Sequence, residues 1–172
     1  LFVRDSVEAD DLTLENALLS INKLKIKNDL NVNNTLGGVK TTEIRGLKRF
    51  ISSAKFASEM SIQVDGKMTV QTGSLISALN SKNYTGTVQP RLDYIIDSLN
   101  EENNGYMKIK VGGDFILDGN INSVKSTEPG GSIYIESGGQ LSGNGQVIAN
   151  GGTYTSSGYG TYYQPGGRIH IK

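Results

Sequence analysis

The chain has 172 residues with 17 Lys or Arg and 17 Asp or Glu, so its formal net charge is zero. This balance removes the simplest electrostatic case for binding nucleic acid or an anionic membrane surface, since both favour a basic footprint. The absence of cysteine excludes disulfide frameworks and Cys-based metal sites. No apolar run approaches the roughly 18 residues that a membrane-spanning helix needs. We therefore expect no nucleic-acid partner, no membrane span, no metal and no cofactor.

The N-terminal segment, residues 1–11, contains the acidic run DSVEADD. A short run of like charges is typical of a solvated segment, and the alternative is a linker from a preceding domain. The chain begins with leucine rather than methionine, which indicates a processed or excised piece.

After this run, four segments share one pattern: two alternating apolar residues, a polar or glycine-containing bend, and two more alternating apolar residues. Alternation at a period of two places such side chains on one face of a strand. The distance from Ile109 to Ile133 is 24 residues, which we interpret as close to one full repeat. The closing GRIHIK begins another pair with Ile169 and Ile171. The four segments read KLKIKNDLNV, SIQVDGKMTV, KIKVGGDFIL and SIYIESGGQL.

These short segments favour a β-solenoid over hairpins. Runs of about three residues are poor for an isolated hairpin, whereas in a solenoid each strand pairs with the equivalent strand one coil away. The stretches VGGDF, ESGGQL and NGGT place glycines at corners, where we expect positive φ. The predicted fold is mostly β: a short right-handed parallel β-helix, with residues 1–172 forming one domain.

Two segments between the repeats show helical spacing instead. Residues 46–58 carry apolar residues at i, i+3, i+4 and i+7, and residues 90–103 do the same between a proline and a glycine. We expect two helical insertions within the coils of residues 12–105, followed by glycine-rich coils in residues 106–172. An α+β fold with helices packed on an antiparallel sheet explains these two segments equally well.

The C-terminal part carries a resemblance to a known kind of repeat. The stretch FILDGNINSVKSTEPGGSIYIESGGQLSGNGQVIANGG is followed by a variable glycine-rich loop and GGRIHIK. It resembles the glycine-rich repeats of very large secreted or cell-surface proteins. Such repeats are similar to parallel β-helix proteins, including adhesins, autotransporter passengers and relatives of the pectin-lyase superfamily. The resemblance covers residues 106–172 and implies an extracellular or cell-surface location.

A tyrosine-rich loop, TYTSSGYGTYYQP, is the main candidate binding site. An exposed tyrosine presents a flat apolar ring and a hydroxyl, which suit stacking on sugars and contacts at protein interfaces. The other interpretation is a long loop whose rings fold back on the solenoid wall. The candidate ligand- or partner-binding residues are Tyr154, Tyr159, Tyr162 and Tyr163.

The enzymatic alternative is a polysaccharide lyase or hydrolase of the β-helix type. Such a lyase would need acidic residues on one coil face to hold Ca²⁺ and a basic residue to remove a proton. Asp65 and Asp114 fall near bends of corresponding repeats, so they could stack on one side. An aspartate at a turn, however, usually hydrogen-bonds its own backbone. The remaining candidates are Asp118 and Arg168.

The single histidine, His170, alternates with two isoleucines in RIHIK and should point outward from its strand. A general-base role would need an acidic partner that the sequence does not locate. We therefore expect a protein without enzymatic activity.

The functional expectation follows from the solenoid. End coils expose unpaired strand edges, so we expect further repeats or copies of the chain to cover them. We predict a structural or adhesive module of a larger extracellular or cell-surface protein or filament, with glycans or other surface proteins as further partners. The alternative is a carbohydrate-binding module that uses the tyrosine-rich loop.

Overall fold

The structure is a computed structural model in which every regular element of the described residues is a strand. Most strands belong to two sheets, one of ten strands and one of five, and all pairs within these sheets are parallel. The alternative of an antiparallel sheet covered by helices is therefore wrong. The structure describes residues 2–35, 42–46, 49–52, 55–57, 59–78, 106–123, 131–151, 153–156, 160–163 and 166–172.

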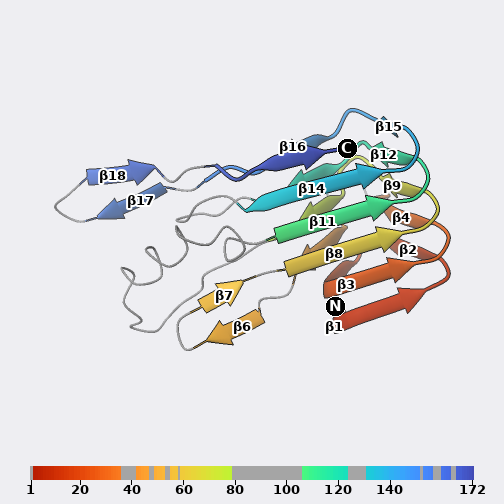
Figure 1. Ribbon diagram of the computed structural model, residues 1–172, viewed down its shortest axis with the longest axis horizontal. Helices are drawn as coiled ribbons and strands as arrows, with labels where there is room; N and C mark the ends of the chain where they lie inside the picture. Colours follow the sequence, from red (N-terminus) through yellow and green to blue (C-terminus); the bar gives the residue numbers. More distant parts are fainter. Residues whose placement is uncertain are drawn as a thin grey trace.

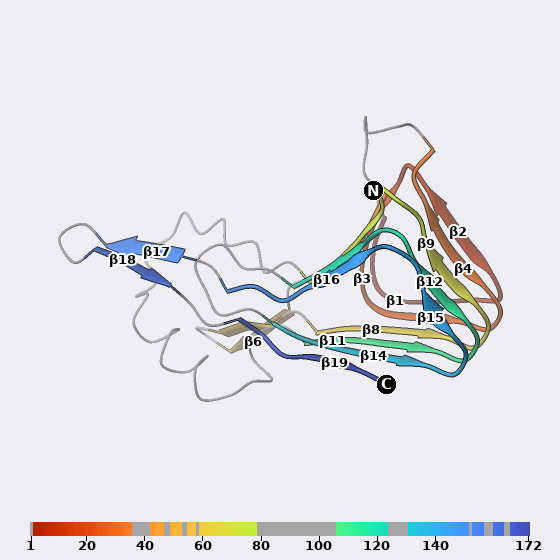
Figure 2. The same cartoon turned by 90° about the horizontal axis from the view of Figure 1, so that it is seen from above.

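The chain winds repeatedly through three walls, and each strand pairs with the strand that follows it on the same wall (Figure 1). We call each turn a coil; seen from above, the three walls enclose a triangular, nearly closed section (Figure 2). This arrangement is compatible with the expected β-solenoid. We number the walls 1 to 3 in the order in which each coil passes through them. Two long strands, β1 (Phe2–Ala9) and β3 (Leu18–Ile26), each begin in wall 3 and end in wall 1, and they join these two walls into the larger sheet.

The remaining strands divide cleanly among the walls. Wall 1 also contains β8 (Glu59–Val64), β11 (Tyr106–Val111), β14 (Ser132–Ser137) and β19 (Ile169–Ile171). Wall 2 contains β2 (Leu12–Glu15), β4 (Leu30–Asn33), β9 (Met68–Val70), β12 (Phe115–Leu117) and β15 (Leu141–Ser142). Wall 3 also contains β5 (Glu43–Gly46), β10 (Leu75–Ser77), β13 (Asn120–Asn122) and β16 (Gln146–Ile148).

The N-terminal acidic segment takes part in this winding. Residues 2–9, within the stretch interpreted as a solvated segment or a linker, form β1 and pair in parallel with β3. Val7 and Ala9 pack against the core from this strand.

The core is a set of apolar ladders, because the parallel register brings like positions of successive coils side by side. On each wall the inward residues alternate with outward ones, as the period of two predicts. Buried ladder residues exclude water along the whole axis, which is the main source of stability in such a fold. One ladder on each wall, in coil order, is Val7–Leu24–Ile62–Ile109–Ile135, Leu12–Leu30–Met68–Phe115–Leu141 and Leu19–Ile44–Ile76–Ile121–Val147.

The repeat length expected from the sequence is two residues short. Ile109 pairs with Ile135, and Ile133 pairs with Met107, so this coil has 26 residues rather than 24. The apolar alternation of β11 begins at Met107, two residues before Ile109, the residue that the repeat pattern aligns with Ile133. Alternation alone cannot choose between registers that differ by two residues, because both place the same face inward.

The prediction of two helical insertions is wrong for residues 46–58. Within residues 46–58 the chain forms the antiparallel strands β6 (Arg49–Ser52) and β7 (Lys55–Ala57). A connection that leaves and re-enters the coils at one corner is closed by a hairpin, and Phe and Ile favour strands as readily as their spacing imitates a helix. Residues 90–103 lie outside the described residues.

The glycines at the corner between walls 1 and 2 are required for a different reason than expected. Gly112 and Gly138 do not have positive φ; among the described glycines only Gly73, Gly143 and Gly160 do. A Cβ added to Gly112 would lie 2.2 Å from the carbonyl oxygen of Asp65 in the preceding coil. Glycine is needed at positions 112 and 138 because the backbone of the preceding coil approaches too closely there for a side chain.

The longer connections cluster at the corner between walls 3 and 1. The corner between walls 1 and 2 is closed by two or three residues in each coil, whereas the chain makes excursions after β5, β10, β13 and β16. Two of them contain hairpins, which extend on the same side of the coils (Figures 1 and 2). A further connection, residues 34–42, joins walls 2 and 3. The excursions comprise residues 47–58, 78–105, 123–131 and 149–168.

Candidate functional site

The tyrosine-rich segment forms a hairpin that projects away from the coils (Figure 1). Its strands β17 (Thr153–Ser156) and β18 (Gly160–Tyr163) are antiparallel and place Tyr154 opposite Tyr162. Thr and Tyr favour such strands. Tyr159 lies outside the described residues.

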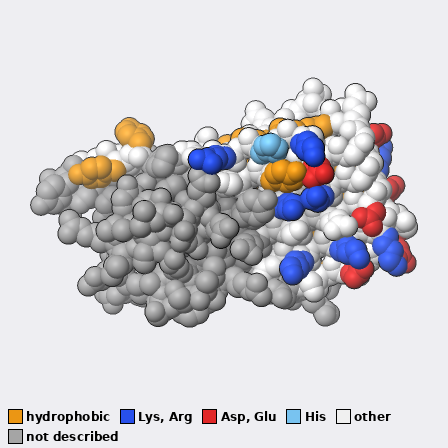
Figure 3. All heavy atoms as spheres, viewed as in Figure 1, with side chains coloured by type: hydrophobic (Ala, Val, Ile, Leu, Met, Phe, Trp, Pro, Cys, Tyr) orange, Lys and Arg blue, Asp and Glu red, His pale blue; other side chains and the backbone are white. Residues whose placement is uncertain are grey.

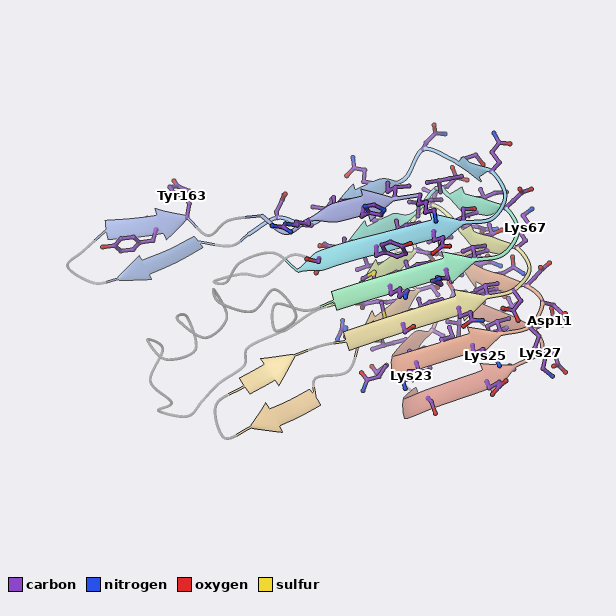
Figure 4. All side chains as sticks on the ribbon, in the orientation of Figure 1. Asp11, Lys23, Lys25, Lys27, Lys67 and Tyr163 are labelled. Atoms are coloured by element: carbon purple, nitrogen blue, oxygen red, sulfur yellow. The ribbon has the colours of Figure 1, made fainter. Side chains whose placement is uncertain are left out.

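Two of the tyrosines are exposed rather than folded back on a wall. Tyr162 is 50% exposed and Tyr163 is 83% exposed, and Figure 4 shows Tyr163 on the projecting hairpin. An aromatic ring that is left in water is available for stacking or for an interface. These two residues are therefore the part of the predicted site that the structure places in reach of another molecule.

The outward face of wall 1 forms a second candidate surface. Tyr134 and His170 occupy the same position on neighbouring strands, and their rings are stacked, with centroids 5.1 Å apart and planes 5° apart. Lys108 occupies that position one coil earlier, with its Nζ 5.7 Å from the Tyr134 ring centroid. His170 thus lies outward as its alternation indicates, but its neighbour is an aromatic ring and not a carboxylate.

Ion pairs cross the strands on this face. The Glu136 carboxylate accepts hydrogen bonds from Lys110 Nζ at 3.0 Å and from the Tyr134 hydroxyl at 2.8 Å. Both hydrogen bonds lower the pKa of Glu136, and the bond from Lys110 is the larger cause. Lys25 donates to Glu8 at 2.9 Å, and this contact raises the pKa of Lys25. Such exposed pairs contribute little to stability. Their arrangement matters mainly for the charge that this surface presents.

Aspartates at the corner between walls 1 and 2 join one coil to the next. Asp11 Oδ1 accepts the backbone N–H of Asp29 at 3.1 Å, and Asp29 Oδ1 accepts that of Lys67 at 2.9 Å. Asp114 Oδ1 accepts the N–H of Gln140 at 2.9 Å. Each carboxylate therefore satisfies a donor of the following coil, instead of its own turn as expected.

The residues proposed for a lyase are not brought together. Asp65 aligns with Gly112 rather than with Asp114 and accepts a hydrogen bond from the Gln63 side chain at 3.0 Å. Asp118 lies at the corner between walls 2 and 3, where it accepts the Asn144 N–H at 3.0 Å.

Arg168 immediately precedes β19, so it lies at the opposite end of wall 1 from Asp65 and Asp114. Within the described residues, no three His, Asp or Glu side chains are grouped as ligands for a metal ion.

The corner carboxylates predict a response to acid. Asp11 accepts the Asn28 side-chain amide at 3.1 Å as well as the Asp29 N–H, and these bonds, the first being the larger cause, lower the pKa of Asp11. A carboxyl whose pKa is lowered by folding stabilises the protein above its unfolded pKa, and this contribution is lost as pH falls through the lowered value. We therefore expect Asp11→Asn to lower the melting temperature at pH 7 and to flatten its decrease below about pH 4.

Thermal unfolding followed by circular dichroism between pH 7 and pH 2 measures this effect. Asp10→Asn is the matched control, because it removes the neighbouring charge and leaves both hydrogen bonds to Asp11 intact. An equal flattening in both variants would mean that general charge, and not the bonds to Asp11, determines the response.

Comparisons of the chain with protein-family models, with curated proteins and with solved structures find no match. The described part of the chain contains no helix of the length and apolarity needed to cross a bilayer. The outward face of wall 1 was not predicted as a site, although KLKIK, KIKV and RIHIK carry its signal. In each of these, basic or imidazole side chains alternate with the inward apolar residues.

Proposed function

We propose that the chain is a structural and adhesive module of a larger extracellular or cell-surface protein or filament. The observation that carries this proposal is the open C-terminal end of the coils. Ile169 and Ile171 are 44% and 50% exposed, whereas the residues beneath them on the same ladders, Ile133 and Ile135, are 1% and 0% exposed. On wall 2, Leu141 is 36% exposed above the fully buried Phe115.

Such an end favours stacking of one more coil. Among the described strands, β15, β16 and β19 each pair on one side only, so their outer edges present free backbone donors and acceptors beside apolar side chains. A strand added in parallel would pair these backbone groups and cover the apolar side chains at the same time. The partner proposed for this end is a further repeat or a second copy of the chain.

The excursions at the corner between walls 3 and 1 support the adhesive part of the proposal. The turns between walls 1 and 2 are short and uniform, whereas the excursions all join wall 3 to wall 1. Loops on a rigid scaffold commonly carry binding function. A carbohydrate-binding module is the second candidate, and the exposure of Tyr162 and Tyr163 on the projecting hairpin favours it.

Light scattering and negative-stain microscopy over a concentration series test the stacking. We expect particles that lengthen end to end as concentration rises. Ile171→Asp should abolish this growth, because it places a charge on the apolar ladder at the open end. His170→Asp is the matched control. It adds an acidic side chain at the preceding residue of the same strand, on the outward face, and should preserve growth. A compact monomer at every concentration would overturn the proposal.

A further inference from the structure

Although the chain has no net charge, the outward face of wall 1 is basic. Figure 3 views this face, and positive side chains gather over β3 and β11. Two outward rows cross the strands, one through Lys23 and Lys108 and one through Lys25 and Lys110. Lys172 extends the second row, since its backbone bonds to Ile135 and Ser137 on either side of Glu136. The acidic side chains in these rows are Glu8 and Glu136.

The two rows differ in how their charges are satisfied. Lys25 and Lys110 are paired with Glu8 and Glu136, so the second row is largely neutralised. Within the described residues, Lys23 and Lys108 have no carboxylate at ion-pair distance, and the Lys108 ammonium lies over the Tyr134 ring. The first row therefore presents two lysines that are free to bind an anion.

The walls fix the spacing of these lysines. They occupy the same position on strands two coils apart, with Ser61 between them. Neighbouring strands are about 4.8 Å apart, which separates the two backbone positions by roughly 10 Å. Beyond Lys108, the row continues through the stacked Tyr134 and His170 rings. Positive charge thus alternates with hydroxyl and ring groups along the axis of the coils.

We propose that this row binds an anionic polysaccharide that lies across the strands of wall 1. Two lysines set roughly 10 Å apart complement a polymer with widely separated carboxylates or sulfates. Duplex DNA, by contrast, carries one charge per about 1.7 Å and calls for a denser basic surface. Ser61 between the two cations and the exposed His170 farther along the row supply hydrogen-bonding groups, which suits the many hydroxyls of a sugar chain.

This surface is separate from the tyrosine hairpin, and its two lysines lie on β3 and β11, away from β19 at the open end of the coils. Failure of the stacking proposed above therefore leaves it intact, and the reverse also holds. Figure 4 labels Lys23 on the face and Lys27 and Lys67 at the corner between walls 1 and 2. These corner lysines offer a control that changes the same charge at a different place.

Titration calorimetry of the whole chain with polygalacturonate, dextran sulfate and uncharged dextran tests the proposal. We expect binding to at least one anionic polymer and none to dextran. The double variant Lys23→Gln/Lys108→Gln should weaken that binding about tenfold, in line with the loss of two ionic contacts at the surface. Lys27→Gln/Lys67→Gln, with the same net charge, should change it less than about twofold. Which polymer binds distinguishes carboxylate from sulfate as the recognised group.

Three outcomes would overturn the proposal. The first is no binding to either anionic polymer in low salt. The second is an equal loss in both double variants, which would mean that net charge alone attracts the polymer. The third is tighter, row-dependent binding to a DNA duplex or to vesicles containing phosphatidylserine than to either polysaccharide, which would assign the face to another class of partner.

Discussion

Replacement of Phe115 by alanine is expected to lower the free energy of unfolding by about 3–5 kcal/mol. Phe115 is the largest fully buried side chain among the described residues and stands on the wall 2 ladder between Met68 and Leu141. Removing its ring leaves a cavity as well as losing apolar burial. Because the ladder residues on either side are held by parallel strand pairing, the site can collapse only partly.

Urea unfolding followed by circular dichroism measures the change. Ile116→Ala is the matched control, since Ile116 lies on the same three-residue strand but points outward and is only partly buried. We expect the control to cost clearly less than Phe115→Ala. Similar losses in both variants would mean that strand propensity, and not the inward ladder, stabilises this coil.

The strands and their stacking follow from the sequence because one physical rule controls both. Alternation of apolar residues defines the inward face, and the repeated bend forces each strand to pair with its equivalent in the next coil. The register between coils does not follow, since Met107, Ile109 and Val111 offer more than one alignment to Ile133 and Ile135. Only the fit of the whole coil chooses among these alignments.

The hairpin of residues 49–57 shows where local spacing is misleading. Its apolar residues satisfy a helical period, yet the segment is too short to form a stable helix without tertiary packing. Its two ends return to the same corner of the coils, which an antiparallel pair achieves directly. Closure of the connection is a property of the surrounding coils, and no window of the sequence contains it.

The candidate surfaces were predictable to different degrees. The cluster of tyrosines is visible in the sequence, but the exposure of Tyr162 and Tyr163 depends on the hairpin projecting from the coils. The basic row on wall 1 combines Lys23 with Lys108, which are far apart in the chain. They share a row only because β3 and β11 both pair with β8. Its lysines alternate with core residues in each segment, but a row is defined only once the register is known.

The second large effect is expected at the corner between walls 1 and 2. Gly112→Ala should lower the free energy of unfolding by about 2–3 kcal/mol, because the new Cβ would lie 2.2 Å from the carbonyl oxygen of Asp65. Both atoms belong to parts of the backbone that the parallel strands hold in place. Relief of this contact requires the two coils to separate.

Gly112→Asn distinguishes close approach from a need for positive φ. Asparagine tolerates the left-handed region better than alanine does, so it would be the milder change if the conformation were the constraint. Since Gly112 lacks positive φ, we expect asparagine to be at least as destabilising as alanine in urea unfolding. Gly166→Ala is the control, with its nearest atom, the Ala149 oxygen, at 3.2 Å, and should cost much less. A smaller loss with asparagine than with alanine at position 112 would show that backbone conformation, and not the spacing of the coils, requires glycine there.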